Sequence, residues 1–208
     1  MSRMSDHGKP LREQDVDPDP LRQFAAWFDE AGEAGIRLPE AVAVATASAD
    51  GAPSLRMVLM KHFDADGFAF YTNFDSRKGR ELAANPRAAL LFHWDPLGRQ
   101  VRIEGPVTRM SLEESAAYVR SRPRGSQLSA LASPQSETVA SREVREREVA
   151  ELAELHAGAD LPLPSAWGGF RVLPATFEFW QQREDRLHDR LRYSHGDHGD
   201  WLIERLAP

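Results

Sequence analysis

The sequence has 208 residues, enough for one domain with a buried core. Its 26 Lys and Arg against 32 Asp and Glu give a formal net charge of −6, which argues against a general nucleic-acid binder. Cysteine is absent, which excludes disulfides, thiol nucleophiles and cysteine-ligated metal centres. No apolar stretch approaches the ~20 residues that span a bilayer, and no signal-peptide core is visible, so we expect a cytoplasmic protein.

The N-terminal region is polar and rich in Asp and Pro, which predicts a flexible arm over residues 1–18 and one domain over residues 19–208. A helix should begin after Asp19, because Asp is a good N-cap and Pro20 suits the first helical position. Glycine at position 32 should end this helix.

Short strands follow, separated by turns. The pairs Asp50-Gly51 and Asp66-Gly67 are typical of hairpin turns, because glycine tolerates positive φ. We expect strands at residues 42–46, 54–61, 68–72, 88–94, 100–107, 170–172, 176–180, 191–193 and 201–205. We expect helices at residues 76–84, 111–120 and 141–156. Short antiparallel strands with interleaved helices predict a mainly β fold of the α+β class, a β-barrel with helical additions.

Two cations flank the apolar part of one predicted strand. Arg56 and Lys61 are five residues apart, so they face opposite sides of an ideal strand and need not share a ligand. A buried cation requires an anionic partner, and a phosphate would supply it. Two ordinary surface cations remain the alternative.

A second candidate anion site lies where a strand leads into a helix. Tyr71 and Thr72 end the strand, and Arg77 and Lys78 open the helix. Free N–H groups at a helix N-terminus attract anions, whereas cations there are unfavourable for the helix itself. Their presence therefore favours a bound anion over a solvated first turn.

A third candidate site carries Arg120, Arg122 and Arg124 within five residues. Tyr118 and Arg122 should share a helical face, and Pro123 should end that helix near Arg122. Arginine forks match phosphate oxygens. We therefore favour a local anion site over a basic helix end that faces water.

A fourth candidate site combines an aromatic residue with a basic strand. Trp167 precedes two glycines, which would let the backbone approach a flat ligand with the indole as a wall. Alternation puts Arg186, His188 and Arg190 on one strand face, where the imidazole should be neutral unless an anion is near. A salt-linked surface strand is the alternative, and we expect no metal site.

These segments, in this order, resemble the pyridoxine/pyridoxamine 5′-phosphate oxidase family over residues 19–208. The most specific pieces are Arg56-Met-Val-Leu-Met-Lys61, Tyr71-Thr-Asn73, Ser76-Arg-Lys78, Ser121-Arg-Pro-Arg124, Pro164-Ser-Ala-Trp-Gly-Gly-Phe-Arg171, Glu178-Phe-Trp-Gln181 and Arg186-Leu-His-Asp-Arg190. The resemblance implies an FMN-binding split β-barrel that works as a homodimer with FMN between the subunits.

The resemblance also implies which residues form the site. The implied FMN site consists of Arg56, Met57, Val58, Leu59, Met60, Lys61, Tyr71, Thr72, Arg77, Lys78, Gln100, Gln135, Ser136, Trp167 and Arg190. The implied substrate site consists of Lys61, Tyr118, Arg122, Ser126, Arg186, Leu187 and His188. Arg186 and His188 would lie against the substrate ring as the catalytic residues.

The implied reaction oxidises the 4′ carbon of pyridoxine or pyridoxamine 5′-phosphate, giving pyridoxal 5′-phosphate. Dioxygen would reoxidise FMN and yield hydrogen peroxide, and the amine would release ammonia. Two alternatives stay open: an oxidase of the same fold acting on another ring, such as a phenazine precursor, and a non-catalytic FMN or pyridoxal-phosphate binding protein. The phosphate-binding set of Lys61, Arg122 and Ser126 argues against the first. Arg186 and His188 argue, to a lesser degree, against the second.

Overall fold

The computed structural model describes residues 9–196 and 199–208, and a β-barrel forms its centre. The barrel strands are β1 (Ala41–Ala47), β2 (Pro53–Asp64), β3 (Gly67–Asn73), β4 (Arg87–Trp94), β5 (Arg99–Arg109) and β6 (Trp167–Val172). They pair antiparallel in the order β4-β1-β2-β3-β6-β5, and pairing of β4 with β5 closes the barrel. The predicted barrel with helical additions is confirmed.

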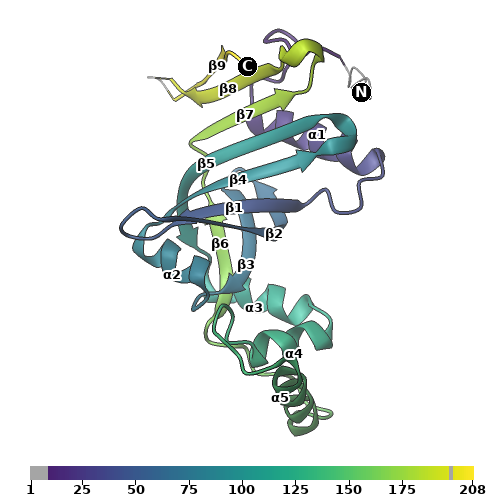
Figure 1. The fold of residues 1–208 in the computed structure, drawn as a ribbon, viewed down its shortest axis with the longest axis vertical. Coiled ribbons are helices and arrows are strands. Elements are labelled where there is room, and N and C mark those ends of the chain that lie inside the picture. The colour runs from purple at the N-terminus through teal and green to yellow at the C-terminus, as the bar shows by residue number, and fades with distance from the viewer. Residues whose placement is uncertain (1–8, 197–198) are drawn as a thin grey trace.

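Three further strands extend the sheet beyond the barrel. They are β7 (Thr176–Gln181), β8 (Asp189–His195) and β9 (Trp201–Arg205). β7 pairs with the same strand β5 that closes the barrel, and β8 and β9 follow in order. This extension lies at one end of the molecule, and the barrel lies in the middle (Figure 1).

The helices are α1 (Pro20–Glu33), α2 (Arg77–Ala84), α3 (Leu112–Ser121), α4 (Arg124–Ala132) and α5 (Arg142–Leu155). Helices α3, α4 and α5 gather at the end of the molecule opposite to β8 and β9 (Figure 1). The sequence analysis missed α4, because it used Pro123 only as a stop for α3, whereas Pro123 is also the N-cap of α4. In the described part of the chain, no helix is long and apolar enough to cross a membrane.

Helix α1 supplies the aromatic centre of the core. It begins as expected, with the Asp19 side chain accepting a hydrogen bond from the Leu21 amide at 2.9 Å. Its Phe24 is fully buried, and the ring centroid lies 4.9 Å from those of Phe63, Phe68 and Phe92. Burying one such side chain contributes about 1.5–3 kcal/mol, so Phe24 anchors α1 to the barrel.

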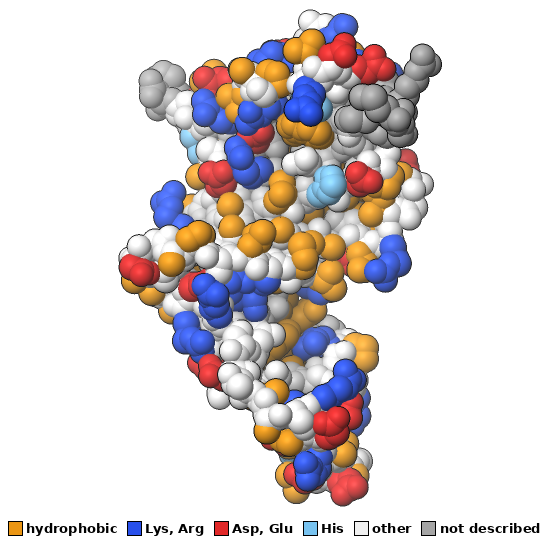
Figure 2. All heavy atoms as spheres, in the orientation of Figure 1, with side chains coloured by type: hydrophobic (Ala, Val, Ile, Leu, Met, Phe, Trp, Pro, Cys, Tyr) orange, Lys and Arg blue, Asp and Glu red, His pale blue; other side chains and the backbone are white. Residues whose placement is uncertain are grey.

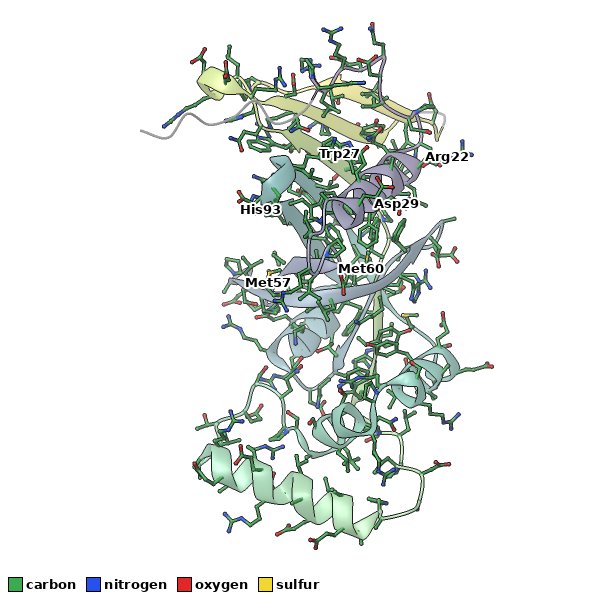
Figure 3. The ribbon with its side chains drawn as sticks, turned by 90° about the vertical axis from the view of Figure 1, so that its right-hand side faces the viewer. Arg22, Trp27, Asp29, Met57, Met60 and His93 are labelled. Atoms are coloured by element: carbon green, nitrogen blue, oxygen red, sulfur yellow. The ribbon has the colours of Figure 1, made fainter. Side chains whose placement is uncertain are left out.

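One outer face of the barrel is apolar and open to solvent. Leu55 and Met57 on β2 are 68% and 63% exposed, and Leu91 on β4 is also exposed. Ala43 of β1 pairs with both Met57 and Leu91, so the three side chains form one row across three strands. Figure 2 shows hydrophobic side chains across the middle of the molecule, and Figure 3 places Met57 and the buried Met60 on β2. Contiguous exposed apolar surface of this kind is typical of an interaction face.

The described part of the predicted N-terminal arm packs against the C-terminal strands. Leu11 is buried, and its amide donates to Asp189 Oδ2 at 3.1 Å. Arg205 of β9 binds Glu13 through two hydrogen bonds and also donates to the Leu11 carbonyl oxygen at 2.8 Å. Residues 9–18 are therefore attached to the sheet rather than flexible. The buried Leu11 makes this contact, and the polar composition of the region did not indicate it. Residues 1–8 of the predicted arm lie outside the described residues.

Candidate functional site

The first charged group lies where β1, β2 and α2 meet. Arg56 donates to Thr46 Oγ1 at 2.5 Å, and its Nη2 lies 3.3 Å from Glu81 Oε2. Glu81 also accepts hydrogen bonds from Ser54 and from Arg77, whose Nε lies 2.8 Å away. The sequence analysis expected a ligand phosphate as the partner of Arg56. The structure gives it a carboxylate of the protein instead, and the analysis had missed Glu81.

The Glu81 carboxylate is ionised although it is only 6% exposed. Burial alone raises its pKa, but hydrogen bonds from Ser54, Thr46, Arg77 and Arg56 outweigh burial and hold the pKa at about 2. Glu81 therefore supplies one full negative charge against the two arginines. The four-residue spacing of Arg77 and Glu81 on α2 was the available sequence signal.

Lys78 is a buried cation whose hydrogen-bond partners within residues 9–196 and 199–208 are all neutral. Its Nζ donates to Thr72 Oγ1 and to Gln135 Oε1, both at 2.9 Å, and to Ser76 Oγ at 3.4 Å. Burial, and secondarily the charge of Arg56, lower its pKa to about 8. We call Thr72, Ser76, Lys78 and Gln135 the Lys78 cluster. It unites three residues expected at the FMN site and retains a positive charge for an anion.

A second cluster joins α3 to the start of β6, and we call Tyr71, Tyr118, Arg122 and Trp167 the Arg122 cluster. The ring centroids of Tyr71 and Tyr118 lie 3.8 Å apart, and the Tyr118 ring is nearly parallel to Trp167, at 4°. Burial raises the pKa of the Tyr118 hydroxyl, which therefore stays a neutral donor. Trp167, expected at the FMN site, thus lies beside two residues expected at the substrate site.

Arg122 in this cluster is set up to receive an anion. It is the C-cap of α3, as the Pro123 argument predicted, and its Cζ lies 4.5 Å from the centroid of the Trp167 ring. Its Nη1 is buried and has no hydrogen-bond partner among the described residues. Because a buried donor without a partner is costly, a ligand oxygen at this position would be stabilising.

The third set lies around the turn between β7 and β8. The backbone amide of Arg183 donates to His188 Nδ1 at 3.2 Å, so Nε2 is the ring nitrogen that carries hydrogen. The expectation that Arg186, His188 and Arg190 share one strand face was wrong. Arg186 lies in the short 3₁₀ helix η2 (Glu184–Arg186) with a φ of 60°, and β8 begins only after His188.

Trp180 is a residue that the sequence analysis did not assign to the site. Its ring centroid lies 4.6 Å from that of His188. The strand register places it between Gln100 and Arg190, two residues expected at the FMN site. Arg190 is held by Glu178, with 2.9 Å between Nε and Oε1. The sequence signal was a Glu and a Trp within a short strand, but only the pairing of β5, β7 and β8 shows what flanks them.

The remaining residues of β2 divide between the two faces of the strand. Leu59 is exposed beside Met57, whereas Met60 is buried. The pairing of β2 with β3 shifts register between Met60 and His62, so Lys61 lies at a β-bulge and is exposed. Exposure nevertheless alternates along β2 as far as Lys61, so the half-buried Arg56 and the exposed Lys61 lie on opposite faces, as the ideal-strand argument predicted.

Three other predicted site residues lie in helix starts and loops. Ser126 is in the first turn of α4 and donates its amide to the Pro123 carbonyl oxygen at 2.8 Å. Ser136 follows Gln135 with a φ of 76°, a left-handed conformation in which residues other than glycine are uncommon. Leu187 is exposed beside His188.

Within one chain, the predicted site residues outside barrel strand β2 fall into two separate groups. The Lys78 and Arg122 clusters lie toward the end that carries α3 and α4, whereas η2 and β8 lie at the other end, with the barrel between them (Figure 1). A small ligand that contacts both groups must therefore take one group from each of two copies of the chain.

Comparison with known proteins is consistent with this arrangement. A family model described as pyridoxamine 5′-phosphate oxidase matches residues 28–156, and one described as the pyridoxine 5′-phosphate oxidase C-terminal dimerisation region matches residues 167–208. The dimerisation region holds β6 to β9, and with them the complete His188 turn. The dimerisation match supports a homodimer.

Individual relatives are similar along nearly the whole chain. A pyridoxine/pyridoxamine 5′-phosphate oxidase of Rubrobacter xylanophilus is 56% identical over 95% of this chain and 91% of its own length. The Bordetella petrii enzyme of that name is 52% identical over 99% and 97%.

Solved structures include PhzG from Burkholderia lata in complex with tetrahydrophenazine-1-carboxylic acid. It has a TM-score of 0.90 and 34% identity over 97% of this chain and all of its own. Two family models together match most of this chain, and several relatives are more than 50% identical to it over at least 95% of its length. The chain belongs to the pyridoxamine 5′-phosphate oxidase family.

Proposed function

We propose that the protein is an FMN-dependent oxidase that converts pyridoxine 5′-phosphate or pyridoxamine 5′-phosphate to pyridoxal 5′-phosphate, as a homodimer in the cytoplasm. One observation carries this proposal: the chain holds two separate cationic clusters, centred on Lys78 and Arg122. Among the described residues, Lys78 donates only to neutral oxygens, and Arg122 Nη1 has no hydrogen-bond partner, so each cluster can bind an anion. FMN and the substrate each bring one phosphate. The curated relatives carry the corresponding enzyme name.

The residues present fit FMN. The Lys78 cluster would hold its phosphate, with Arg56 and Arg77 adding charge on the side that Glu81 partly neutralises. The row of Gln100, Trp180 and Arg190 would contact FMN from the second copy. FMN, when bound, supplies a two-electron acceptor that dioxygen reoxidises with formation of hydrogen peroxide.

The substrate would lie between the Arg122 cluster of one copy and the His188 turn of the other. Arg122, together with Lys61, Tyr118 and Ser126, would hold the phosphate. Arg186 and His188 would contact the ring and orient the 4′ carbon. Alignment of two bound rings can contribute roughly 7–11 kcal/mol to lowering a barrier, so positioning is the main task of these side chains.

The phenazine alternative has one supporting observation, the similarity to PhzG at a TM-score of 0.90. The carboxylate of a phenazine-type acid could also satisfy the Arg122 Nη1. However, the relatives named for the phosphorylated vitamers are 52–56% identical to this chain, whereas PhzG is 34% identical. We therefore favour the vitamer reaction.

Oxygen consumption by the purified protein tests the proposal. With FMN added, the protein should bind the flavin and consume dioxygen with pyridoxine 5′-phosphate, forming a product with aldehyde absorbance. Unphosphorylated pyridoxine should react far more slowly, because Arg122 then lacks its anion. A flavin-loaded protein that consumes no dioxygen with either phosphorylated vitamer would contradict the oxidase assignment and leave FMN binding intact.

A further inference from the structure

We propose that Trp167 is a positioning residue for substrate phosphate binding: its indole holds the Arg122 guanidinium in place without using any of its N–H donors. This inference rests on the proposed function, because it concerns the same phosphate site. This role differs from the wall of a flat-ligand site that the Trp-Gly-Gly pattern predicted and from the FMN contact that the family resemblance implied for Trp167.

The position of Trp167 is fixed by the backbone around it. Trp167 begins β6, where it pairs with Asn73 of β3, and its amide donates to the Pro164 carbonyl oxygen at 3.0 Å. These contacts involve main-chain atoms on both sides of the residue. The indole therefore projects from a rigid strand rather than from a loop, as a positioning residue requires.

The two glycines after Trp167 allow helix α3 to approach this strand. A Cβ atom on Gly168 would lie 2.5 Å from Phe74 Cζ and 2.9 Å from Ser115 Oγ. The Gly169 amide donates to Ser115 Oγ at 3.2 Å, and Ser115 of α3 is only 2% exposed. The space beside the glycines, where the sequence analysis expected a flat ligand, is thus filled by the side chains of Phe74, Met110 and Ser115, the last of them on α3.

Because α3 is seated on β6, its C-terminal residues reach the indole. Tyr118 lies parallel to it, with ring centroids 6.0 Å apart, and Arg122 Cζ lies 4.5 Å from its centroid. An aromatic face attracts a guanidinium through the ring quadrupole. A carboxylate would also hold the arginine, but it would occupy N–H groups and cancel the charge that a phosphate needs.

The state of Arg122 Nη1 supports the proposal that the indole holds the guanidinium while its N–H groups remain available to a phosphate. Arg122 Nη1 is buried and finds no hydrogen-bond partner among the residues that the structure describes, although the guanidinium is in contact with the indole. Contact with the Trp167 ring thus fixes the plane of the guanidinium and leaves Nη1 available to donate to a ligand oxygen. The contrast with Arg56 is direct, because Arg56 is bound by Glu81, Thr46 and Ser54.

The test compares Trp167→Leu with Trp167→Phe at saturating FMN. The Leu variant should raise KM for pyridoxine 5′-phosphate about tenfold while kcat and FMN content change less than about twofold, since the lost contact is a cation–π interaction. The Phe variant keeps an aromatic face and should recover most of the affinity. An unchanged KM in Trp167→Leu, or an equal loss of FMN content, would overturn the inference.

A double-mutant cycle separates positioning from general damage. In an Arg122→Ala background, Trp167→Leu should raise KM by less than about twofold, because the indole then has no guanidinium to hold. A full tenfold increase in both backgrounds would show that Trp167 acts independently of Arg122 and would contradict the inference.

The chain offers a matched control in a second Arg–Trp pair. Arg99 Cζ lies 4.4 Å from the Trp27 ring, and Figure 3 shows Trp27 on α1, far from the end that carries α3 in Figure 1. Trp27→Phe should lower the melting temperature and leave KM unchanged. If the wild-type protein shows no turnover, the proposed function fails. Calorimetric binding of pyridoxal 5′-phosphate to the same variants then still tests the role of Trp167.

Discussion

Lys78 and Glu81, three residues apart on α2, carry opposite charges and differ in the partners that surround them. Glu81 is an ionised carboxylate that pairs with Arg56 and Arg77, whereas the ammonium of Lys78 donates only to neutral oxygens in the part of the chain that the structure describes. One carboxylate thus neutralises part of the charge of the two arginines, and the Lys78 ammonium keeps its own charge at a buried atom. This makes the affinity for a phosphate at the Lys78 cluster sensitive to the protonation of a single group.

The lowered pKa of Lys78 predicts how FMN affinity depends on pH. Below pH 8 the ammonium is charged in the free protein, and affinity should be maximal; above its pKa of about 8, affinity should fall by up to about tenfold per pH unit. Lys78→Arg should remove this dependence, because arginine stays charged. Fluorescence titration of FMN between pH 6.5 and 9.5 measures both profiles. Parallel profiles for the two proteins would refute the role of Lys78.

The two anion sites should respond separately to mutation. Arg122→Ala should raise KM for pyridoxine 5′-phosphate by about tenfold to a hundredfold, as expected for loss of charged hydrogen bonds, and leave the FMN content unchanged. Lys78→Met should weaken FMN binding, with KM unchanged once FMN is saturating. Absorbance of the bound flavin and steady-state kinetics measure the two effects. If each variant lost both properties equally, the two sites would be wrongly assigned.

For single residues, the sequence predicted the cations of the site better than the side chains that contact them. Residue type alone singled out Lys78 and Arg122, because basic side chains at a helix start or before a proline are conspicuous. The partner of Arg56, Glu81, lies 25 residues away and meets it only through the packing of α2 on β1 and β2. Trp180 lies between Gln100 and Arg190 because of how β7 pairs with β5 and β8. The residue pattern of one strand does not show which residues of other strands lie beside it.

Among the elements, the order of strands and helices was predictable because turns and caps are local signals. The capping box of Ser111 and Glu114, which starts α3 within the range expected for that helix, is one such signal. Helix α4 and the bulge at Lys61 were not predictable in the same way. The first shares its proline with the end of α3, and the second depends on how β3 pairs with β2.

The docking of α3 on β6 predicts a specific effect of adding one methyl group. Gly168→Ala should destabilise the protein by about 1–3 kcal/mol, because its Cβ would overlap the Phe74 ring and Ser115 Oγ. Gly32→Ala in α1 is the control, since a Cβ there meets nothing within 4 Å and alanine favours helix. Urea unfolding compares the two variants. Equal stability of both would mean that α3 does not need the glycine.

Glu81 links three elements, since it receives hydrogen bonds from β1, β2 and α2. Its pKa of about 2, against an ordinary 4.5, corresponds to about 3 kcal/mol of stability that is present above pH 4.5 and lost as pH falls toward 2. Glu81→Gln should lower stability at pH 7 and flatten the decline between pH 4.5 and 2. Thermal unfolding as a function of pH measures this. An acid limb as steep as that of the unmodified protein would contradict the assignment.

For the whole molecule, two features point to a second copy of the chain. The exposed row of Met57, Ala43 and Leu91 needs a covering surface, and the Arg122 and His188 groups do not meet within one chain. The strand spacing predicted that Arg56 and Lys61 face opposite sides of β2, but not that the side with Leu55, Met57 and Leu59 would face outward. The barrel interior is filled from the other side of the strand and by α1, as the buried Met60 and Phe24 show.

Mixing two impaired variants, assayed at a pyridoxine 5′-phosphate concentration far below KM, tests whether the site is shared. Arg122→Ala removes a residue that would bind the substrate phosphate, and His188→Ala removes a residue that would contact the substrate ring. If each site takes one group from each copy, a mixed dimer has one site with both defects and one site with neither. Co-refolding equal amounts should then restore about a quarter of the wild-type activity, because half of the dimers are mixed and each has one intact site. If both groups served a site within a single chain, no mixed dimer would contain an intact site. Activity would then stay at the level of the separate variants, and the shared site would be ruled out.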